Sequence, residues 1–199
     1  MNENLKKIVE TCNSDVNNTN GIIIKESGEI RPNDAAPALI EVGERIRAVS
    51  MRWGFERNDG KMIINARSES ASERITFRNL VKTNRCALPA AGYFEWRDAD
   101  HLKHLVSSEA SDGFYLAGLF KTDDRGELRF VVLTREAFGM HARIHSRMPL
   151  LLTSGAQARQ WLKGTLSLDE LVVRVPEGLS IQPLGAEQLG MNFDDYPDM

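Results

Sequence analysis

Five short runs of apolar, aromatic and β-branched residues dominate the middle of this chain. Turn-forming sequences separate some of them, including Asp112-Gly113 and Asp124-Arg125-Gly126. Five closely spaced strands with few helices around them are typical of an α+β fold with a mainly antiparallel, barrel-like β-sheet. The runs cover residues 85–89, 92–97, 102–107, 113–120 and 128–134.

Helical patterns flank this β-rich stretch. Apolar residues recur at i, i+3, i+4 and i+7 within residues 3–13, which predicts an amphipathic helix with Cys12 on its apolar side. Capping-box spacing after Ser154 and Ser167 predicts two further helix starts. Another helix is expected over residues 69–82, with three apolar residues facing inward: Ile75, Leu80 and Val81.

The organisation is that of one domain. The chain has 199 residues, enough to bury a core, and no segment has the length or composition of an interdomain linker. We therefore expect a single domain over residues 1–199, ending in an acidic tail at about 187–199. Loops are expected at residues 13–20 and 31–37, and further strands at residues 22–24, 38–42, 46–53, 149–153 and 181–184.

Charge and composition limit the function classes without choosing one. Hydrophobic residues make up 42%, charged residues 27%, and the net charge is -3, as in ordinary globular proteins. Residues 45–97 contain eleven Lys and Arg against five Asp and Glu, whereas residues 187–199 contain four acids and no Lys or Arg. A basic middle permits a polyanion partner such as nucleic acid, although a mixed solvated surface would show the same balance.

Nothing in the sequence indicates a membrane or secretory role. No run approaches the roughly 18 apolar residues of a membrane span, and the N-terminus lacks the apolar core of a signal peptide. The two cysteines, Cys12 and Cys86, do not make a disulfide framework. We therefore expect a cytoplasmic monomer with no membrane association and no cofactor.

Three polar residues, Asn65, Glu95 and His145, are each set among apolar or small neighbours. Arg67 and Arg147 each lie two residues from one of them. Such a set is typical of acid–base chemistry beside a bound anion such as phosphate. Other interpretations remain open from the residues alone, because Asn65 could satisfy a turn and the arginines could make surface salt bridges.

The alternation around Glu95 leaves the direction of its side chain undecided. If Phe94 and Trp96 face the core, Glu95 faces solvent. If instead the sheet closes on a cavity, Glu95 points into it and desolvation raises the pKa of its carboxyl.

The remaining histidines do not complete a metal site. His101 and His104 lie in a polar strand and are expected at the surface. His141 and His145 are four residues apart, as two ligands on a helix would be, but no Cys, Asp or Glu follows at a ligand-like spacing. We therefore expect no metal. The sequence also lacks a G-x-S-x-G motif, a glycine-rich phosphate loop and an H-E-x-x-H motif.

A longer set of motifs occurs over about residues 29–163. The motifs are Arg52-Trp53-Gly54-Phe55, Ile64-Asn65-Ala66-Arg67-Ser68-Glu69, Thr76-Phe77-Arg78, Arg85-Cys86 with Pro89-Ala90, Gly92-Tyr93-Phe94-Glu95-Trp96, and Leu133-Thr134 followed by Ile144-His145-Ser146-Arg147-Met148-Pro149. Their order and spacing resemble those of the SOS-response-associated peptidase (SRAP) family. The family's loop before its second strand is similar to this chain at Pro32, Asp34, Ala36 and Pro37.

The resemblance implies binding of single-stranded DNA that carries an abasic site, whose deoxyribose opens to an aldehyde. In the family, the α-amine of an N-terminal cysteine forms a Schiff base with this aldehyde, and the thiol closes a thiazolidine crosslink. The matching residues imply that Asn65 orients the amine, Glu95 shuttles protons during imine formation and His145 assists opening of the sugar. Arg67 and Arg147 match arginines that hold the flanking phosphates. The implied DNA-binding residues also include Arg52, Trp53 and Pro37.

The opening of the chain departs from the family pattern. The family begins Met-Cys-Gly-Arg, whereas this chain begins Met1-Asn2-Glu3-Asn4, and the amine of Cys12 is tied up in a peptide bond. For the chain as written we expect DNA binding with covalent crosslinking impaired or absent. Two alternatives remain: a non-catalytic module that binds single-stranded DNA, and a peptidase limited to removing its own initiator methionine.

Overall fold

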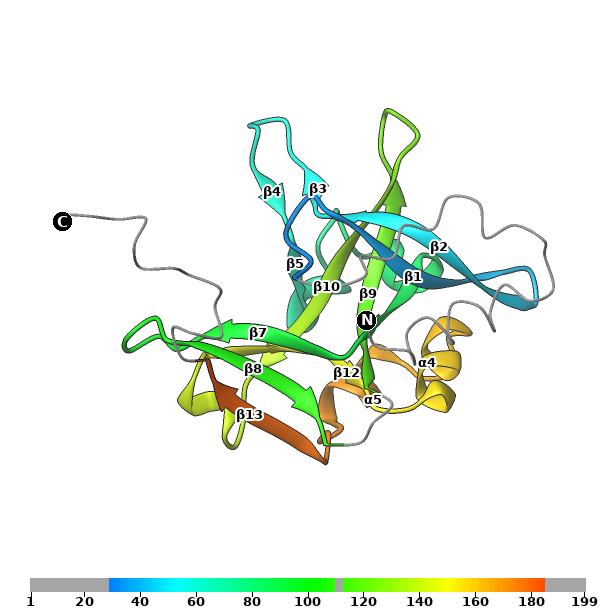
Figure 1. The fold of residues 1–199 in the computed structure, drawn as a ribbon. Coiled ribbons are helices and arrows are strands. Elements are labelled where there is room, and N and C mark those ends of the chain that lie inside the picture. The colour runs from blue at the N-terminus through cyan, green and yellow to red at the C-terminus, as the bar shows by residue number, and fades with distance from the viewer. Residues whose placement is uncertain (1–28, 110–112, 185–199) are drawn as a thin grey trace.

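Strands make up most of the computed structural model, which describes residues 29–109 and 113–184 (Figure 1). Several predictions lie outside the described residues. They are the helix, loop and strand predicted before residue 29, the interpretation of the chain's opening, and the acidic tail. Within them, the predicted α+β class is confirmed: most strand pairs are antiparallel, and the helices are few and short.

The largest sheet closes on itself in a ring. Its strands are β1 (Ala35–Val42), β2 (Arg45–Trp53), β5 (Asn65–Arg67), β6 (Arg85–Ala90), β9 (Phe114–Thr122), β10 (Leu128–Glu136), β11 (Arg147–Pro149) and β12 (Leu151–Leu152). β10 pairs with β9 in antiparallel fashion on one side and with β2 in parallel on the other, so the order β10-β2-β1-β6-β9 returns to β10. β5 also pairs with β10 in parallel, and β11 pairs with its end.

Gly118 allows β9 to lie tightly between its two neighbours in the ring. A Cβ atom built on this glycine would meet the Cys86 sulfur and the Val131 carbonyl oxygen, both at 2.9 Å. Real Cβ atoms do not approach other atoms so closely, so a larger residue would push β6 or β10 outward.

A second, three-stranded antiparallel sheet lies below the ring in Figure 1. It consists of β7 (Gly92–Trp96), β8 (Lys103–Ser108) and β13 (Leu179–Pro183), in the order β13-β8-β7. β7 begins two residues after β6 ends, so the chain passes directly from the ring into this sheet. A separate hairpin of β3 (Phe55–Glu56) and β4 (Met62–Ile63) projects at the top of the molecule.

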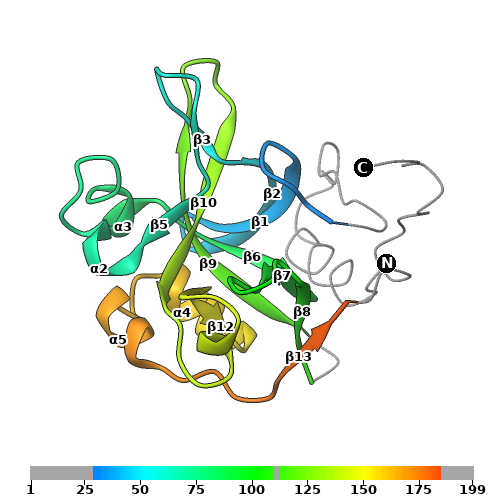
Figure 2. The ribbon, with the colours of Figure 1, turned by 90° about the vertical axis from the view of Figure 1, so that its left-hand side faces the viewer.

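The helices pack on the outside of the strands, as Figure 2 shows. They are α2 (Ser68–Ala71), α3 (Leu80–Thr83), the 3-10 turn η1 (His141–Arg143), α4 (Gly155–Leu162) and α5 (Leu168–Val173). Both predicted helix starts are confirmed, because the Ser154 and Ser167 hydroxyls accept hydrogen bonds from the Gln157 and Glu170 amides. The indole of Trp161 on α4 donates to the Cys86 carbonyl oxygen at 3.0 Å and ties the helix to β6.

Both faces of β10 are buried, as its run of apolar residues requires. Val131 and Leu133 pack into the main core beneath α4 and α5, together with Leu119 and Trp161. Phe130 and Val132 point to the opposite face and join a second cluster that includes Cys86. β10 is therefore a rigid central strand, and the residues at its two ends occupy fixed positions.

One helix prediction is wrong. Residues 69–82 form two single helical turns joined by further turns rather than one helix, and Ile75, expected to face inward, is 82% exposed. Leu80 is half-buried and Val81 is buried, as predicted. The segment contains Ser70, Ser72, Thr76 and Asn79, residue types of low helix propensity, which is consistent with the interruption.

Two smaller expectations also need correction. His104 is buried, not at the surface, because the alternation of β8 turns it toward the core together with Val106. Its Nδ1 lies 2.8 Å from the Leu102 carbonyl oxygen. The single strand expected at residues 149–153 is divided into β11 and β12, and the strand expected at residues 181–184 starts earlier, at Leu179.

Candidate functional site

The alternation of β7 places Glu95 on the shielded face of its sheet. Phe94 and Trp96 point to the other face, where the Lys103 ammonium lies 4.0 Å and 5.1 Å from their ring centroids. The Glu95 side chain is 24% exposed, and its cross-strand partner is the buried His104. The face that the sequence alone left undecided is therefore the inner one.

His145 brings its imidazole to this carboxylate from the loop after η1. Its Nδ1 lies 3.9 Å from Glu95 Oε1, and its Nε2 lies 3.7 Å from Asp98 Oδ1. The loop is held from two sides, because the His141 carbonyl oxygen accepts from the His145 amide and the Ile144 carbonyl oxygen accepts from the Asp98 amide. The ring thus lies between two carboxylates, which suits a group that gains and loses a proton.

Burial raises the pKa of the Glu95 carboxyl, and the nearby Asp98 adds to that rise. The facing His145 and the Trp96 amide act in the opposite direction and lower it. A carboxyl with a raised pKa holds its proton over a wider pH range than an ordinary glutamate, as general acids require.

Two aromatic rings form the inner wall of this site. Tyr93 lies two residues before Glu95 on the same face of β7, and its ring stacks on that of His141 with centroids 6.5 Å apart. Burial and the neighbouring Glu95 raise the pKa of the Tyr93 hydroxyl, and burial lowers the pKa of His141. Tyr93 Oη and His141 Nε2 are buried without hydrogen-bond partners among the described residues. The Gly92-Tyr93-Phe94-Glu95-Trp96 motif contains Tyr93, but nothing in the sequence assigned this residue a role of its own.

Arg147, at the start of β11, is engaged in a two-pronged ion pair. Its Nη1 and Nη2 donate to the two carboxylate oxygens of Glu69 at 2.7 Å and 2.8 Å, and Nη2 also donates to the Thr134 carbonyl oxygen at 2.9 Å. These hydrogen bonds from Arg147 lower the pKa of Glu69 to about 2. The sequence predicts Arg147 as a site residue, whereas only the structure reveals Glu69 as its partner.

Asn65 and Arg67 lie beside the end of β10, where both side chains are exposed on either side of the buried Ala66. β5 runs parallel to β10 with Arg67 opposite Thr134, the residue whose carbonyl oxygen accepts from Arg147. The two arginines predicted to act together therefore border the same strand end. Asn65 makes no side-chain hydrogen bond to Glu95 or His145 within the described residues.

The other residues predicted to bind DNA lie at the opposite end of β10 or in the core. Arg52 binds Glu127, with Nε 3.3 Å from Oε2, and donates to the Asn33 carbonyl oxygen at 2.8 Å. The Trp53 indole donates to the Ile64 carbonyl oxygen at 2.9 Å. Pro37 is buried in β1, which does not fit a direct contact with DNA.

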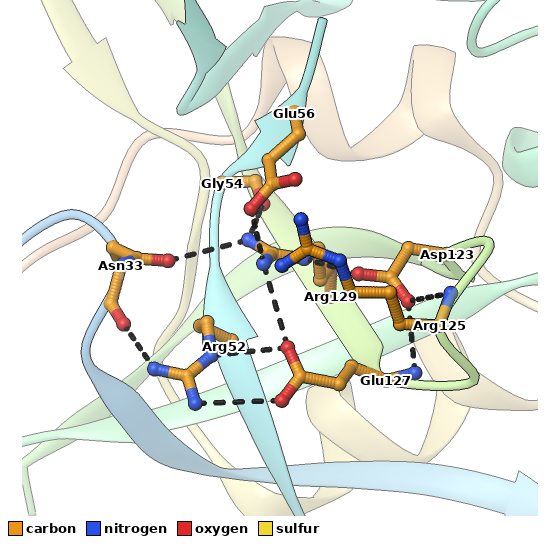
Figure 3. A network of polar contacts seen from close by, with 8 residues as sticks. All are labelled: Asn33, Arg52, Gly54, Glu56, Asp123, Arg125, Glu127 and Arg129. Atoms are coloured by element: carbon orange, nitrogen blue, oxygen red, sulfur yellow. Dashed lines mark hydrogen bonds and ion pairs between the residues drawn. The ribbon is translucent and has the colours of Figure 1, made fainter. Parts of the chain in front are cut away.

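A dense polar network surrounds Arg52 (Figure 3). Its centre is Arg129, which is 2% exposed and reaches carboxylates of Asp123, Glu56 and Glu127 at 2.7, 2.6 and 3.4 Å. The same guanidinium donates to the Asn33 side chain and to the Gly54 carbonyl oxygen. Every nitrogen of Arg129 has a partner, so this network has the character of a structural anchor.

Two further observations concern metal ligands and membrane-spanning helices. Among the described residues, no group of three or more His, Cys, Asp or Glu side chains is placed to hold a metal ion. In the same residues, no helix is both long and apolar enough to cross a membrane.

Comparison with known proteins identifies the family. The family model for SOS response associated peptidase (SRAP) matches residues 1–187, and the chain belongs to this family. It is 28% identical over 149 residues to the abasic site processing protein YoqW of Bacillus subtilis, covering 68% of this chain and 66% of that protein. It is 29% identical over 145 residues to the abasic site processing protein YedK of Escherichia coli, covering 69% of this chain and 65% of that protein. The matches span just under two thirds of the length of these relatives.

Solved structures share the fold. A protein from Bacteroides thetaiotaomicron superposes with a TM-score of 0.64 at 24% identity, covering 79% of this chain and 76% of that chain. A protein from Bordetella bronchiseptica gives a TM-score of 0.65 at 21% identity, covering 80% of this chain and 90% of that chain.

Proposed function

We propose that this protein binds abasic sites in single-stranded DNA and processes them by acid–base chemistry at Glu95 and His145. The observation that carries the proposal is the facing pair itself, a shielded carboxylate 3.9 Å from an imidazole nitrogen. Membership of the SRAP family, with relatives named abasic site processing proteins, supports abasic DNA as the substrate.

The chemistry of an abasic sugar suits such a pair. The deoxyribose is a cyclic hemiacetal, and its opening needs a base to take the proton of the anomeric hydroxyl and an acid to protonate the departing ring oxygen. We assign this opening to His145, because imidazoles exchange protons near neutral pH. We assign to Glu95, whose pKa burial raises, the proton transfers that follow when an amine adds to the aldehyde and water leaves.

The strand end beside this pair offers groups for the DNA backbone. Arg67 is exposed and makes no hydrogen bond or ion pair within the described residues, so its guanidinium is free to bind a phosphate oxygen. We propose Arg67 as a phosphate ligand, Asn65 on the same face as the group that orients the attacking amine, and Arg147 as a neighbour of the same phosphate.

The test compares three single-stranded oligonucleotides: undamaged, abasic after uracil-DNA glycosylase treatment, and carrying a tetrahydrofuran analogue that cannot open. Fluorescence anisotropy measures binding, and a denaturing gel separates crosslinked protein, cleaved strand and intact strand. We expect a product only from the abasic strand. Glu95→Gln should slow whichever product the wild type forms by about 100-fold while binding stays within about threefold. The control is Glu44→Gln, in the exposed turn between β1 and β2.

Other outcomes distinguish the alternatives. Equal binding of all three strands with no product would identify a non-catalytic binding module. If Glu95→Gln processes the abasic strand as fast as the wild type, Glu95 is not the group that transfers the protons.

A further inference from the structure

Glu69 accepts hydrogen bonds from both strands of the β10–β11 pair at the point where β11 begins. Its two carboxylate oxygens take the two Nη groups of Arg147 at 2.7 Å and 2.8 Å, and Oε1 also accepts from the Glu136 amide of β10 at 3.1 Å. Arg147 and Glu136 are themselves cross-strand partners. One side chain from α2 therefore fixes the end of this strand pair.

Arg147 in turn holds the imidazole of His145 through its backbone. The Arg147 amide nitrogen and carbonyl oxygen both lie 3.1 Å from His145 Nδ1. The neutral ring can accept from the amide, and the protonated ring can donate to the carbonyl oxygen. Displacement of residue 147 would disturb both bonds, and with them the approach of the ring to Glu95 and Asp98.

We propose that Glu69 is a positioning residue for His145 and acts through Arg147. In the part that concerns catalysis, this inference rests on the function proposed above. Glu69 does not touch the reacting groups. It holds the Arg147 guanidinium in place and balances its charge, so that the backbone of residue 147 presents a fixed donor and acceptor to the imidazole.

The arrangement also separates the roles of the two arginines at this strand end. Of the Arg147 nitrogens, Nη1 and Nη2 are bound and Nε is buried, whereas Arg67 is exposed. The positive charge of Arg147 is balanced by Glu69, so Arg67 is the stronger candidate for capture of a phosphate.

The first test follows the ring resonances of His145 by NMR in the absence of DNA. The charged side chains facing the ring are those of Glu95 and Asp98, and Arg147 contacts it through its backbone. In Glu69→Gln, Arg147 loses the carboxylate that holds its guanidinium, so the backbone of residue 147 no longer presents a fixed donor and acceptor, and the His145 ring resonances should move from their wild-type positions. The matched control is Glu73→Gln, since Glu73 is exposed four residues further along the same segment. His145→Asn identifies the resonance.

A double-mutant cycle shows whether Glu69 acts through Arg147. In an Arg147→Met background, Glu69→Gln should cause no further shift of His145. Two results would overturn the proposal. One is a His145 shift on Glu69→Gln that is as large in the Arg147→Met background as in the wild type; the other is a His145 signal in the single variant Glu69→Gln that is identical to the wild type's. If Glu69→Gln does not fold, Glu69→Asp replaces it with Glu73→Asp as control, and identical His145 signals in those two variants would likewise overturn it.

The second test is the rate of abasic-site processing. Glu69→Gln should reduce the rate about tenfold with little change in DNA affinity, and the pH profile of its rate should differ from that of the wild type. Glu73→Gln should match the wild type. If no form of the protein processes abasic DNA, the proposed function fails, and the comparison of the His145 ring resonances still decides the positioning role.

Discussion

β10 carries a polar cluster at each end, and the two clusters are built in opposite ways. At its start, Arg129 is buried and each of its guanidinium nitrogens has a partner, with carboxylate contacts as short as 2.6 Å (Figure 3). At its end, His145 faces Glu95 at 3.9 Å and Asp98 at 3.7 Å, and Tyr93 Oη beside them has no partner among the described residues.

This difference separates the cluster that stabilises the fold from the cluster whose titratable groups are available to react with a substrate. A saturated network holds its members in one arrangement and leaves no group free to bind a ligand. A loose set of shielded titratable groups costs stability, because each forgoes hydrogen bonds to water, and it keeps those groups available to a substrate. The residues predicted for DNA binding divide accordingly: Arg52 lies in the saturated cluster, and Arg67 and Arg147 lie at the open end.

The largest expected effect comes from breaking the saturated cluster. Arg129→Met leaves Asp123 and Glu56 without their cation, and leaves Glu127 with Arg52 alone. Removing one member of a buried ion network costs about 3 kcal/mol or more of unfolding free energy. Urea denaturation measures this loss. Arg125→Met, in the exposed turn between β9 and β10, is the control and should change stability by less than about 0.5 kcal/mol. Equal stability of the two variants would contradict the anchoring role.

The two kinds of carboxylate should show opposite pH dependence. Glu95 has a raised pKa in the folded protein, so its contribution to stability is present at low pH and is lost as pH rises from about 4.5 through the raised value. Glu69, with a pKa lowered to about 2, contributes stability above pH 4.5 that is lost as pH falls toward 2.

Urea midpoints between pH 2.5 and pH 7 test both signs. The wild type should lose stability relative to Glu95→Gln as the pH rises, and should gain stability relative to Glu69→Gln over the acidic part of the same range. Parallel curves for all three proteins would show that neither carboxylate is perturbed by folding.

Local patterns in the sequence predicted the strands well and the distant contacts poorly. The five central strands follow from alternation and turn residues, which act within a few positions. The closing of the ring depends on parallel pairing of β10 with β2, and nothing in the local pattern specifies that partner. The break in the segment at residues 69–82 shows that apolar spacing alone does not make a helix.

The same limit applies to the site. Resemblance to a family selected Glu95 and His145, and the structure shows that they face each other. The Glu69–Arg147 pair joins residues 78 positions apart, and only the fold reveals it. Alternation could not decide which face of β7 is shielded, because it places Glu95 opposite Phe94 and Trp96 without saying which side meets the core; in the structure Trp96 is the exposed one.

A smaller effect distinguishes the arginines at the two ends of β10. Arg67→Ala should lower the slope of log affinity against log salt concentration by about 0.7 for single-stranded DNA, because it removes one phosphate contact. Arg52→Ala should lower it less, since Glu127 already offsets the charge of Arg52. Anisotropy titrations at several salt concentrations measure both slopes. A larger change of slope in Arg52→Ala than in Arg67→Ala would indicate that DNA binds at the start of β10 rather than at its end.

The smallest expected effect concerns the inner wall of the open cluster. The Tyr93 hydroxyl is buried without a hydrogen-bond partner in the described part of the chain, so it forgoes hydration and gains nothing in return. Tyr93→Phe keeps the ring that packs on Phe114 and His141, and removes the hydroxyl. We expect unfolding free energy to rise by up to about 1 kcal/mol, measured by urea denaturation. Tyr115→Phe, on β9, is the comparison, because the Tyr115 hydroxyl is not among the buried unpartnered atoms of the described residues, and this variant should not gain stability. A loss of stability in Tyr93→Phe would mean that its hydroxyl is bonded in solution, and the cluster at this end of β10 would be less open than its geometry indicates.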